Sequence, residues 1–170
     1  MKEHALIVRL ALYQPDIPQN LGSAIRLCAC FGVGLDVVDP CGFPLTDKAL
    51  KRAALDYGDY ASVIRHPHFA AFLSAPERRG GRLVLLETTG AVGLYDHAFA
   101  PGDTLILGRE SAGSPPELVA GAAAVLRIPM AAGLRSLNVI TAGAVALAEA
   151  LRQTGGMAAL WDQDKGPDRP

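Results

Sequence analysis

The sequence predicts an α/β protein with a mostly parallel sheet and helices on both of its faces. Short apolar segments rich in β-branched residues alternate along the chain with segments of helical period, and strands separated by helices favour parallel pairing. Half of the 170 residues are hydrophobic and 19% are charged, as expected for a globular chain with a core of its own. We therefore expect a single domain over residues 1–155.

The first elements show the pattern most clearly. The run ALIVRLALY, at 5–13, is typical of a buried strand, and 18–32 repeats apolar residues at helical spacing with Gly32 as its stop. Thr46 is the expected N-cap of a helix over 46–55. Further strands are expected at 35–40, 61–66, 82–89, 103–108 and 124–129, and further short helices at 68–75 and 115–122.

The last predicted helix runs from about Asn138 to Gln153 and is rich in alanine and glycine. The polar tail over 156–170 is expected to be disordered. The amino terminus reads as a first strand rather than a signal peptide, and no apolar run has the length of a membrane span. With three cysteines and no zinc spacing, we expect reduced thiols in a cytoplasmic protein that has no membrane partner.

Several chemistries find little support in the residues. His66 and His68 offer only two ligands, so no metal site is expected. Cys28 and Cys30 lack a paired histidine and are expected to pack in the core. The G-x-G-x-x-G fingerprint after the first strand and a P-loop lysine are both absent from the sequence.

The formal net charge of −1 argues against a protein that coats nucleic acid, but it leaves room for a local basic patch. The positive charge is concentrated in the first half of the chain. Candidate contacts to an anionic partner are Lys48, Lys51, Arg52, Arg65 and, near the last helix, Arg135.

Three consecutive predicted strands end in segments with small side chains: LLETTG, ILGRESAG and RIPMAAG. In open parallel sheets, ligands bind at the carboxyl ends of strands. Free backbone N–H and C=O groups there can hold the edges of a flat heteroaromatic ring, and four side chains supply apolar walls. The residues favour a pocket for an adenine nucleoside with walls from Leu86, Ile128, Met130 and Leu137.

A polar cluster stands just before the last helix. Ser136 and Asn138 suit helix capping, but capping explains neither Arg135 beside them nor Glu110 in a neighbouring loop. We interpret these residues as candidates for substrate contact.

Three segments resemble the motifs of the SPOUT (α/β-knot) RNA methyltransferases. They are PDIPQNLGSAIRLCACFG, LGRESAGSP and LRIPMAAGLRSLNVITAGAVALAEALRQ, and the intervening GFPLTDKALKRAALDY is also similar. The likeness spans about residues 5–155 and is strongest to the small single-domain tRNA wobble-nucleotide 2′-O-methyltransferases.

The resemblance implies a C-terminal deep trefoil knot that forms an S-adenosylmethionine pocket. It also implies a homodimer through the C-terminal helix region and tRNA, through its anticodon stem-loop, as partner. The small residues of the last helix fit close packing in such a fold. Residues implied in cofactor binding are Leu86, Gly108, Ile128 and Ser136, with Met130 and Leu137 nearby.

The implied reaction is methylation of the ribose 2′-hydroxyl of the tRNA wobble nucleotide, position 34, cytidine or uridine. Arg26 is the residue expected to act in the chemistry, either as base or, since arginine stays protonated, by orienting a phosphate and stabilising a developing alkoxide. The other implied catalytic residues are Asn20, Glu110 and Asn138.

The chain departs from the family's pattern in the second motif. Arg109 replaces a proline, Ala112 an arginine and Ser114 a leucine, while Ala148 stands where relatives often have tyrosine. Two alternatives therefore stay open. One is methylation of another tRNA position or of rRNA, and the other is a non-catalytic RNA- or nucleoside-binding protein.

Overall fold

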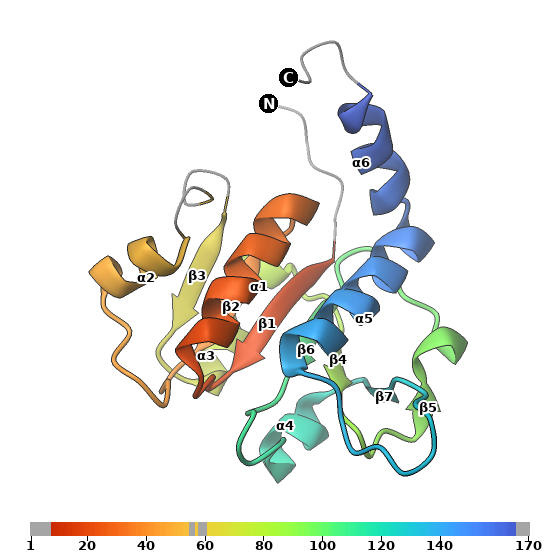
Figure 1. Ribbon diagram of the computed structural model, residues 1–170, viewed down its shortest axis with the longest axis horizontal. Coiled ribbons are helices and arrows are strands. Elements are labelled where there is room, and N and C mark those ends of the chain that lie inside the picture. Colours follow the sequence, from red (N-terminus) through yellow and green to blue (C-terminus); the bar gives the residue numbers. More distant parts are fainter. Residues whose placement is uncertain (1–7, 55–56, 58–60, 166–170) are drawn as a thin grey trace.

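A computed structural model describes residues 8–54, 57 and 61–165. Its centre is a seven-stranded, entirely parallel sheet in the order β3-β2-β1-β6-β4-β7-β5 (Figure 1). The strands are β1 (Arg9–Tyr13), β2 (Leu35–Val38), β3 (Val63–His66), β4 (Leu83–Leu86), β5 (Val92–Gly93), β6 (Thr104–Leu107) and β7 (Ala124–Arg127).

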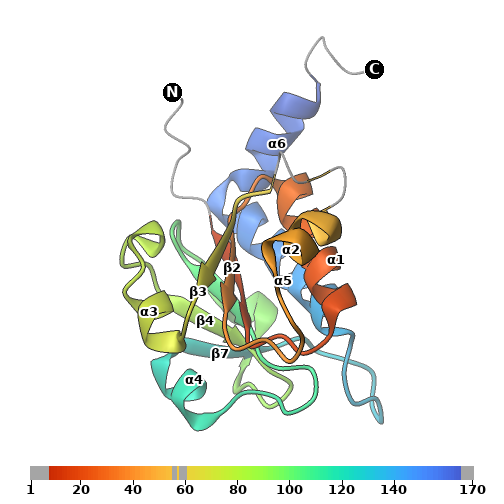
Figure 2. The same cartoon turned by 90° about the vertical axis from the view of Figure 1, so that its left-hand side faces the viewer.

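Helices cover both faces of the sheet, as the sequence predicts. Figure 2 shows α1, α2 and α5 on one side and α3 and α4 on the other. The helices are α1 (Pro18–Phe31), α2 (Asp47–Ala54), α3 (Phe69–Leu73), α4 (Pro116–Gly121), α5 (Val139–Thr154) and α6 (Gly156–Asp164). Two 3-10 turns, η2 (Pro76–Arg78) and η3 (Leu94–Asp96), complete the elements.

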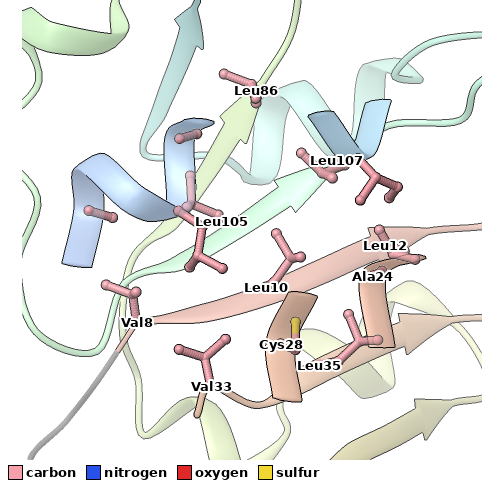
Figure 3. Packing of buried hydrophobic residues seen from close by; sticks show 14 of the residues in the cluster. Val8, Leu10, Leu12, Ala24, Cys28, Val33, Leu35, Leu86, Leu105 and Leu107 are labelled. Atoms are coloured by element: carbon pink, nitrogen blue, oxygen red, sulfur yellow. The ribbon is translucent and has the colours of Figure 1, made fainter. Parts of the chain in front are cut away.

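Alternate residues of the central strands contribute to two separate cores. In β1, Leu10 and Leu12 join the core beneath α1 and α5, whereas Ala11 and Tyr13 join the core beneath α3 and α4. Figure 3 shows the first core, which includes side chains of β1, β2, β4 and β6 together with Cys28 of α1. Because both faces are covered, the strands are apolar almost throughout.

Local signals place the helix ends where the sequence predicts them. Gly32 adopts φ 62° at the end of α1, a conformation that suits glycine. The Thr46 hydroxyl accepts the amide of Ala49 at 3.0 Å in the first turn of α2. The side chain of Asn138 caps α5 by accepting the amides of Ile140 and Thr141.

Three expectations differ from the structure. The tail prediction is wrong for 156–164, because these residues form α6, which extends beyond α5 (Figure 1); 166–170 lie outside the described residues. Cys28 is buried as expected, but Cys30 is exposed. The two-residue strand β5 is too short to produce a sequence pattern. Within the described part of the chain, no helix is long and apolar enough to cross a membrane.

Candidate cofactor and substrate site

A cavity of about 410 Å³ opens at the carboxyl ends of β4, β6 and β7. This volume falls within the range of small-molecule sites, about 300–1,000 Å³. Its walls come from the loops after these strands and from the starts of α1 and α5. The segment over 128–138, which joins β7 to α5 (Figure 1), contributes Ile128, Met130, Ser136, Leu137 and Asn138 to the lining.

The structure brings the expected nucleoside pocket together from distant segments. All six residues implied in cofactor binding line this one cavity. Leu107 and Ala142 add apolar surface to it. The six are Leu86, Gly108, Ile128, Met130, Ser136 and Leu137.

Gly108 allows the backbone of β6 to form the cavity wall. A Cβ at this position would lie 2.4 Å from the Oγ of Ser114 and 3.2 Å from the carbonyl carbon of Gly113. Gly113 itself has φ 66°, and its amide and carbonyl pair with Arg109 across the turn. The turn therefore exposes backbone at the cavity and leaves no room for a side chain at Gly108.

Three of the four implied catalytic residues form a hydrogen-bonded chain at the cavity wall. The amide of Asn138 donates to Oδ1 of Asn20 at 3.2 Å, and the amide of Asn20 donates to Oε1 of Glu110 at 3.0 Å. The other Glu110 oxygen accepts the backbone amide of Asp16 at 3.0 Å. The chain ties the start of α5 to the start of α1 and to the loop after β6.

The pKa values of two neighbouring carboxyl groups, Glu110 and Asp16, are shifted in opposite directions. Burial raises the pKa of Glu110, and the adjacent Asp16 adds to the rise. The interaction with Glu110 and the hydroxyl of Ser111 lower the pKa of Asp16. Neighbouring carboxyl groups that interact this closely have their pKa values driven apart.

Arg26, the fourth implied catalytic residue, does not line the cavity. It is exposed on α1, and its guanidinium carbon lies 5.0 Å from the ring centroid of Tyr57. This distance is typical of a cation–π contact. Within a single chain, Arg26 is therefore held by an aromatic ring and not by the groups at the cavity.

The expected RNA contacts are exposed but lie in two places. Lys48, Lys51 and Arg52 lie on α2, whereas Arg135 lies in the segment before α5. Arg65 is already engaged: it donates to Asp39 at 2.8 Å and to the carbonyl of Leu45 at 2.7 Å.

The two histidines considered as metal ligands have structural partners. Nε2 of His66 lies 2.8 Å from Oδ1 of the buried Asp36, and Nδ1 of His68 accepts the amide of Ala71 in the first turn of α3. Among the residues that the structure describes, no group of three or more His, Cys, Asp or Glu side chains is placed to hold a metal ion.

Several residues that line the cavity were not predicted as site residues. Glu87 and Thr88 line the cavity directly after Leu86, and Arg109 lines it beside Glu110. The segment ETTG was expected at a ligand-binding strand end, so its position was the available signal. Which side chains of this segment face the cavity depends on the path of the loop.

The residues present fit an S-adenosyl nucleoside. Apolar side chains flank the space, the backbone of Gly108 lines it, and the carboxyl groups of Glu87 and Glu110 border it. A flat adenine is held by such walls and backbone edges.

Comparisons with known proteins agree with this arrangement. The sequence matches the model of the SpoU rRNA Methylase family over residues 7–148. A relative from Beijerinckia indica subsp. indica, named tRNA (cytidine(34)-2'-O)-methyltransferase, is 48% identical over 153 residues, covering 90% of this chain and 96% of the relative. A relative of the same name from Ancylobacter novellus is 50% identical, with 90% and 97% covered.

Solved structures share the fold. One, described as "Structural insights into the 2-OH methylation of C/U34 on tRNA", has a TM-score of 0.78 and 43% identity, covering 86% of this chain and 95% of that one. The SpoU methyltransferase AviRb from Streptomyces viridochromogenes, in complex with AdoMet, has a TM-score of 0.78 and 25% identity, covering 89% and 62%. With its fold, its cavity and a family match over most of its length, this chain belongs to the SpoU rRNA methylase family.

Proposed function

We propose that this protein is an S-adenosylmethionine-dependent methyltransferase that modifies the ribose 2′-hydroxyl of the tRNA wobble nucleotide, position 34. The observation that carries the proposal is the convergence of nine implied site residues, six for the cofactor and three for catalysis, on one cavity. Relatives of 48% and 50% identity named for tRNA cytidine-34 support the choice of substrate. Cytidine and uridine are both candidates at this position.

The residues of the chain account for binding and orientation. When bound, S-adenosylmethionine supplies an electrophilic methyl group on its sulfonium. Leu86, Ile128 and Leu137, which line the cavity, would hold the adenine, and the backbone at Gly108 would meet the edge of the nucleoside. Transfer to a hydroxyl is an in-line displacement, so the hydroxyl must be fixed against the methyl while it loses its proton.

Asn20 and Asn138 are placed to fix that hydroxyl. Each amide nitrogen has two N–H groups, and each of these amides uses one within the chain. The remaining N–H groups are donors to a ribose or phosphate oxygen. Glu110 holds Asn20 and the amide of Asp16, so it acts as a positioning residue.

Arg26 supplies positive charge to the substrate phosphate and to the developing alkoxide. Because Arg26 lies outside the cavity of its own chain, we infer a two-fold dimer in which a second copy brings basic residues to the site. Exposed apolar residues beside the cavity support a covering partner; Leu134 is 69% and Leu137 41% exposed. Sedimentation at micromolar concentration is expected to give twice the 17.8 kDa of one chain, and a species of 17.8 kDa alone would contradict the dimer.

The deep trefoil knot belongs to the same proposal. After β7, which lies next to the edge strand β5, the chain returns to the middle of the sheet, where α5 packs against β4, β6 and α1. This return supports the knot.

The test is methyl transfer from labelled S-adenosylmethionine to tRNA that lacks ribose methylation, with the labelled nucleotide mapped. We expect label at the wobble ribose, and a loss of about 10²- to 10³-fold in Arg26→Ala, the usual effect of removing a charge-stabilising group. Arg152→Ala is the matched control, because Arg152 is exposed on α5 and paired with Glu149. Label at another nucleotide would move the substrate to another tRNA position or to rRNA. Cofactor binding without label would favour the non-catalytic alternative.

A further inference from the structure

One carboxylate of the cavity has no part in the catalytic chain. Glu87 follows Leu86 directly at the carboxyl end of β4, is half buried, and lines the cavity. Its backbone is fixed, because its amide donates to the carbonyl of Leu126 at 2.9 Å and its carbonyl accepts the amide of Gly90 at 3.1 Å. The side chain therefore starts from a rigid position on the cavity wall.

Neutral donors hold the Glu87 carboxylate in one orientation. Oε1 accepts the amide of Thr88 at 2.9 Å and its hydroxyl at 3.3 Å, and Oε2 accepts the hydroxyl of Ser114 at 2.8 Å. A carboxylate accepts about four hydrogen bonds, two at each oxygen. Oε1 is thus satisfied within the chain, and Oε2 keeps one acceptor position.

The charge of Glu87 has no cationic partner within residues 8–54, 57 and 61–165, where the ion pairs involve other carboxylates. Oε2 lies beside Gly113, where a Cβ would be in ordinary contact with it at 3.6 Å, so the glycine leaves that side of the oxygen without a side chain. A fixed carboxylate with a free acceptor position at a cavity is suited to a hydrogen-bond donor from the ligand.

The position of Glu87 in the cavity indicates which hydrogen-bond donor of the ligand it would meet. The apolar wall that begins at Leu86 holds the adenine, and the amides of Asn20 and Asn138 mark the place of the reacting hydroxyl, which the sulfonium must face. The cofactor ribose joins these two parts. Glu87 follows Leu86 and lines the same cavity, which would put its carboxylate beside the ribose that is bonded to the adenine.

We propose that Glu87 is a specificity-determining residue that accepts a hydrogen bond from a ribose hydroxyl of the cofactor, with Ser114 and Thr88 as its positioning residues. This inference rests on the proposed function, since it takes the cavity to be the S-adenosylmethionine site. Carboxylates read ribose hydroxyls in the same way in dinucleotide-binding folds, which share no fingerprint with this chain. The site therefore selects ribonucleoside ligands over their deoxy analogues.

The experiment is calorimetric titration of wild type and Glu87→Gln with S-adenosylhomocysteine, S-adenosylmethionine and the 2′-deoxy and 3′-deoxy forms of S-adenosylhomocysteine. Thr89→Ala is the matched control, because Thr89 is exposed in the same loop and does not line the cavity. We expect Glu87→Gln to weaken both natural ligands by about 10- to 100-fold, the usual size of a hydrogen bond to a charged group. Thr89→Ala is expected to bind as wild type does.

The deoxy analogues identify the contact. We expect wild type to bind one of the two deoxy analogues about 10- to 100-fold more weakly than S-adenosylhomocysteine. Glu87→Gln is expected to bind that analogue and S-adenosylhomocysteine equally. Equal binding of S-adenosylhomocysteine by wild type and Glu87→Gln would overturn the proposal. A loss confined to S-adenosylmethionine would also overturn it, because the carboxylate would then read the sulfonium charge. If wild type bound neither natural ligand, the proposed function itself would fail.

Discussion

The two halves of the sheet treat their polar side chains differently. In the β1–β2–β3 half, charged groups are paired with one another: Asp36 with Arg9 and His66, and Asp39 with Arg65. In the other half Arg82 and Asp103 are also paired, just before β4 and β6, but at the carboxyl ends of β4, β6 and β7 polar groups line a cavity and keep unused donors or acceptors. The pairing within one half supports the fold, and the unused groups of the other half are available to a ligand.

The largest effect that tests this comparison is expected at Asp36. Its side chain is fully buried, accepts from Nε of Arg9 and lies 2.8 Å from Nε2 of His66. Asp36→Asn removes the charge and leaves a buried cation without compensation, so we expect a loss of about 3–5 kcal/mol in the free energy of unfolding. Urea unfolding measures the loss.

Asp39→Asn is the control for this prediction, since Asp39 and Arg65 are 21% and 35% exposed. We expect a loss of about 1 kcal/mol or less, as is usual for exposed pairs. Both variants, while folded, are expected to bind S-adenosylhomocysteine as wild type does. A change of affinity in folded Asp36→Asn would show that the two halves are coupled.

A substitution at Gly108 tests the half of the sheet that carries the cavity. In Gly108→Ala the new Cβ would meet the Oγ of Ser114 at 2.4 Å, which forces the cavity turn to move. Overpacking of this kind costs about 1–3 kcal/mol, so we expect S-adenosylhomocysteine to bind about 10- to 100-fold more weakly by calorimetry. Gly22→Ala serves as control, because its Cβ would meet the carbonyl of Ala53 at an ordinary 3.7 Å. Unchanged affinity in Gly108→Ala would refute the close approach of ligand and backbone.

The ring of Tyr57 contacts the guanidinium of Arg26, which lies outside the cavity of the same chain. A cation–π contact is worth about 1 kcal/mol, so we expect Tyr57→Leu to lower kcat about fivefold by loss of the guanidinium's orientation. Tyr57→Phe keeps the ring and is expected to restore kcat, with KM for tRNA the same in both. An undiminished kcat in Tyr57→Leu would mean that Arg26 acts without this support.

Sequence patterns located the elements of both halves but could not pair them. The apolar run at 5–13 and the caps Gly32, Thr46 and Asn138 are local signals. The structure confirms the strand over Arg9–Tyr13, with 5–7 outside the described residues, and the helices that the caps predict. The insertion of β6 between β1 and β4 is a long-range choice that leaves no local pattern. α6 was missed because Gly155 and Gly156 read as a stop, although Gly155 adopts φ 84° and a second helix follows.

The candidate site shows the same limit. Family motifs brought Asn20, Glu110 and Asn138 to attention, and the structure joins them by hydrogen bonds. The contact of Arg26 with Tyr57 and the orientation of Glu87 depend on side-chain packing between segments that are distant or irregular in sequence. Such contacts follow from tertiary structure and not from residue type.

Tyr13 lies at the boundary of the two halves, at the carboxyl end of β1 between β2 and β6. Burial and the hydrogen bond that its hydroxyl donates to Glu117 raise the pKa of Tyr13 from 10.0 to about 12. The folded state thus keeps the proton that the unfolded chain releases above pH 10. The stability contributed by this group is complete below pH 10 and is lost as the pH rises to about 12.

Tyr13→Phe isolates this contribution because it keeps the ring that packs edge-on against Phe69 at 5.6 Å. We expect wild type to exceed Tyr13→Phe by about 1 kcal/mol in the free energy of unfolding at pH 8, with the difference shrinking as the pH rises above 10. Urea unfolding at a series of pH values gives this difference directly. A difference that stayed constant up to pH 12 would mean that the Tyr13 hydroxyl titrates alike in the folded and unfolded chains. Tyr13 would then not belong with the paired side chains of the β1–β2–β3 half.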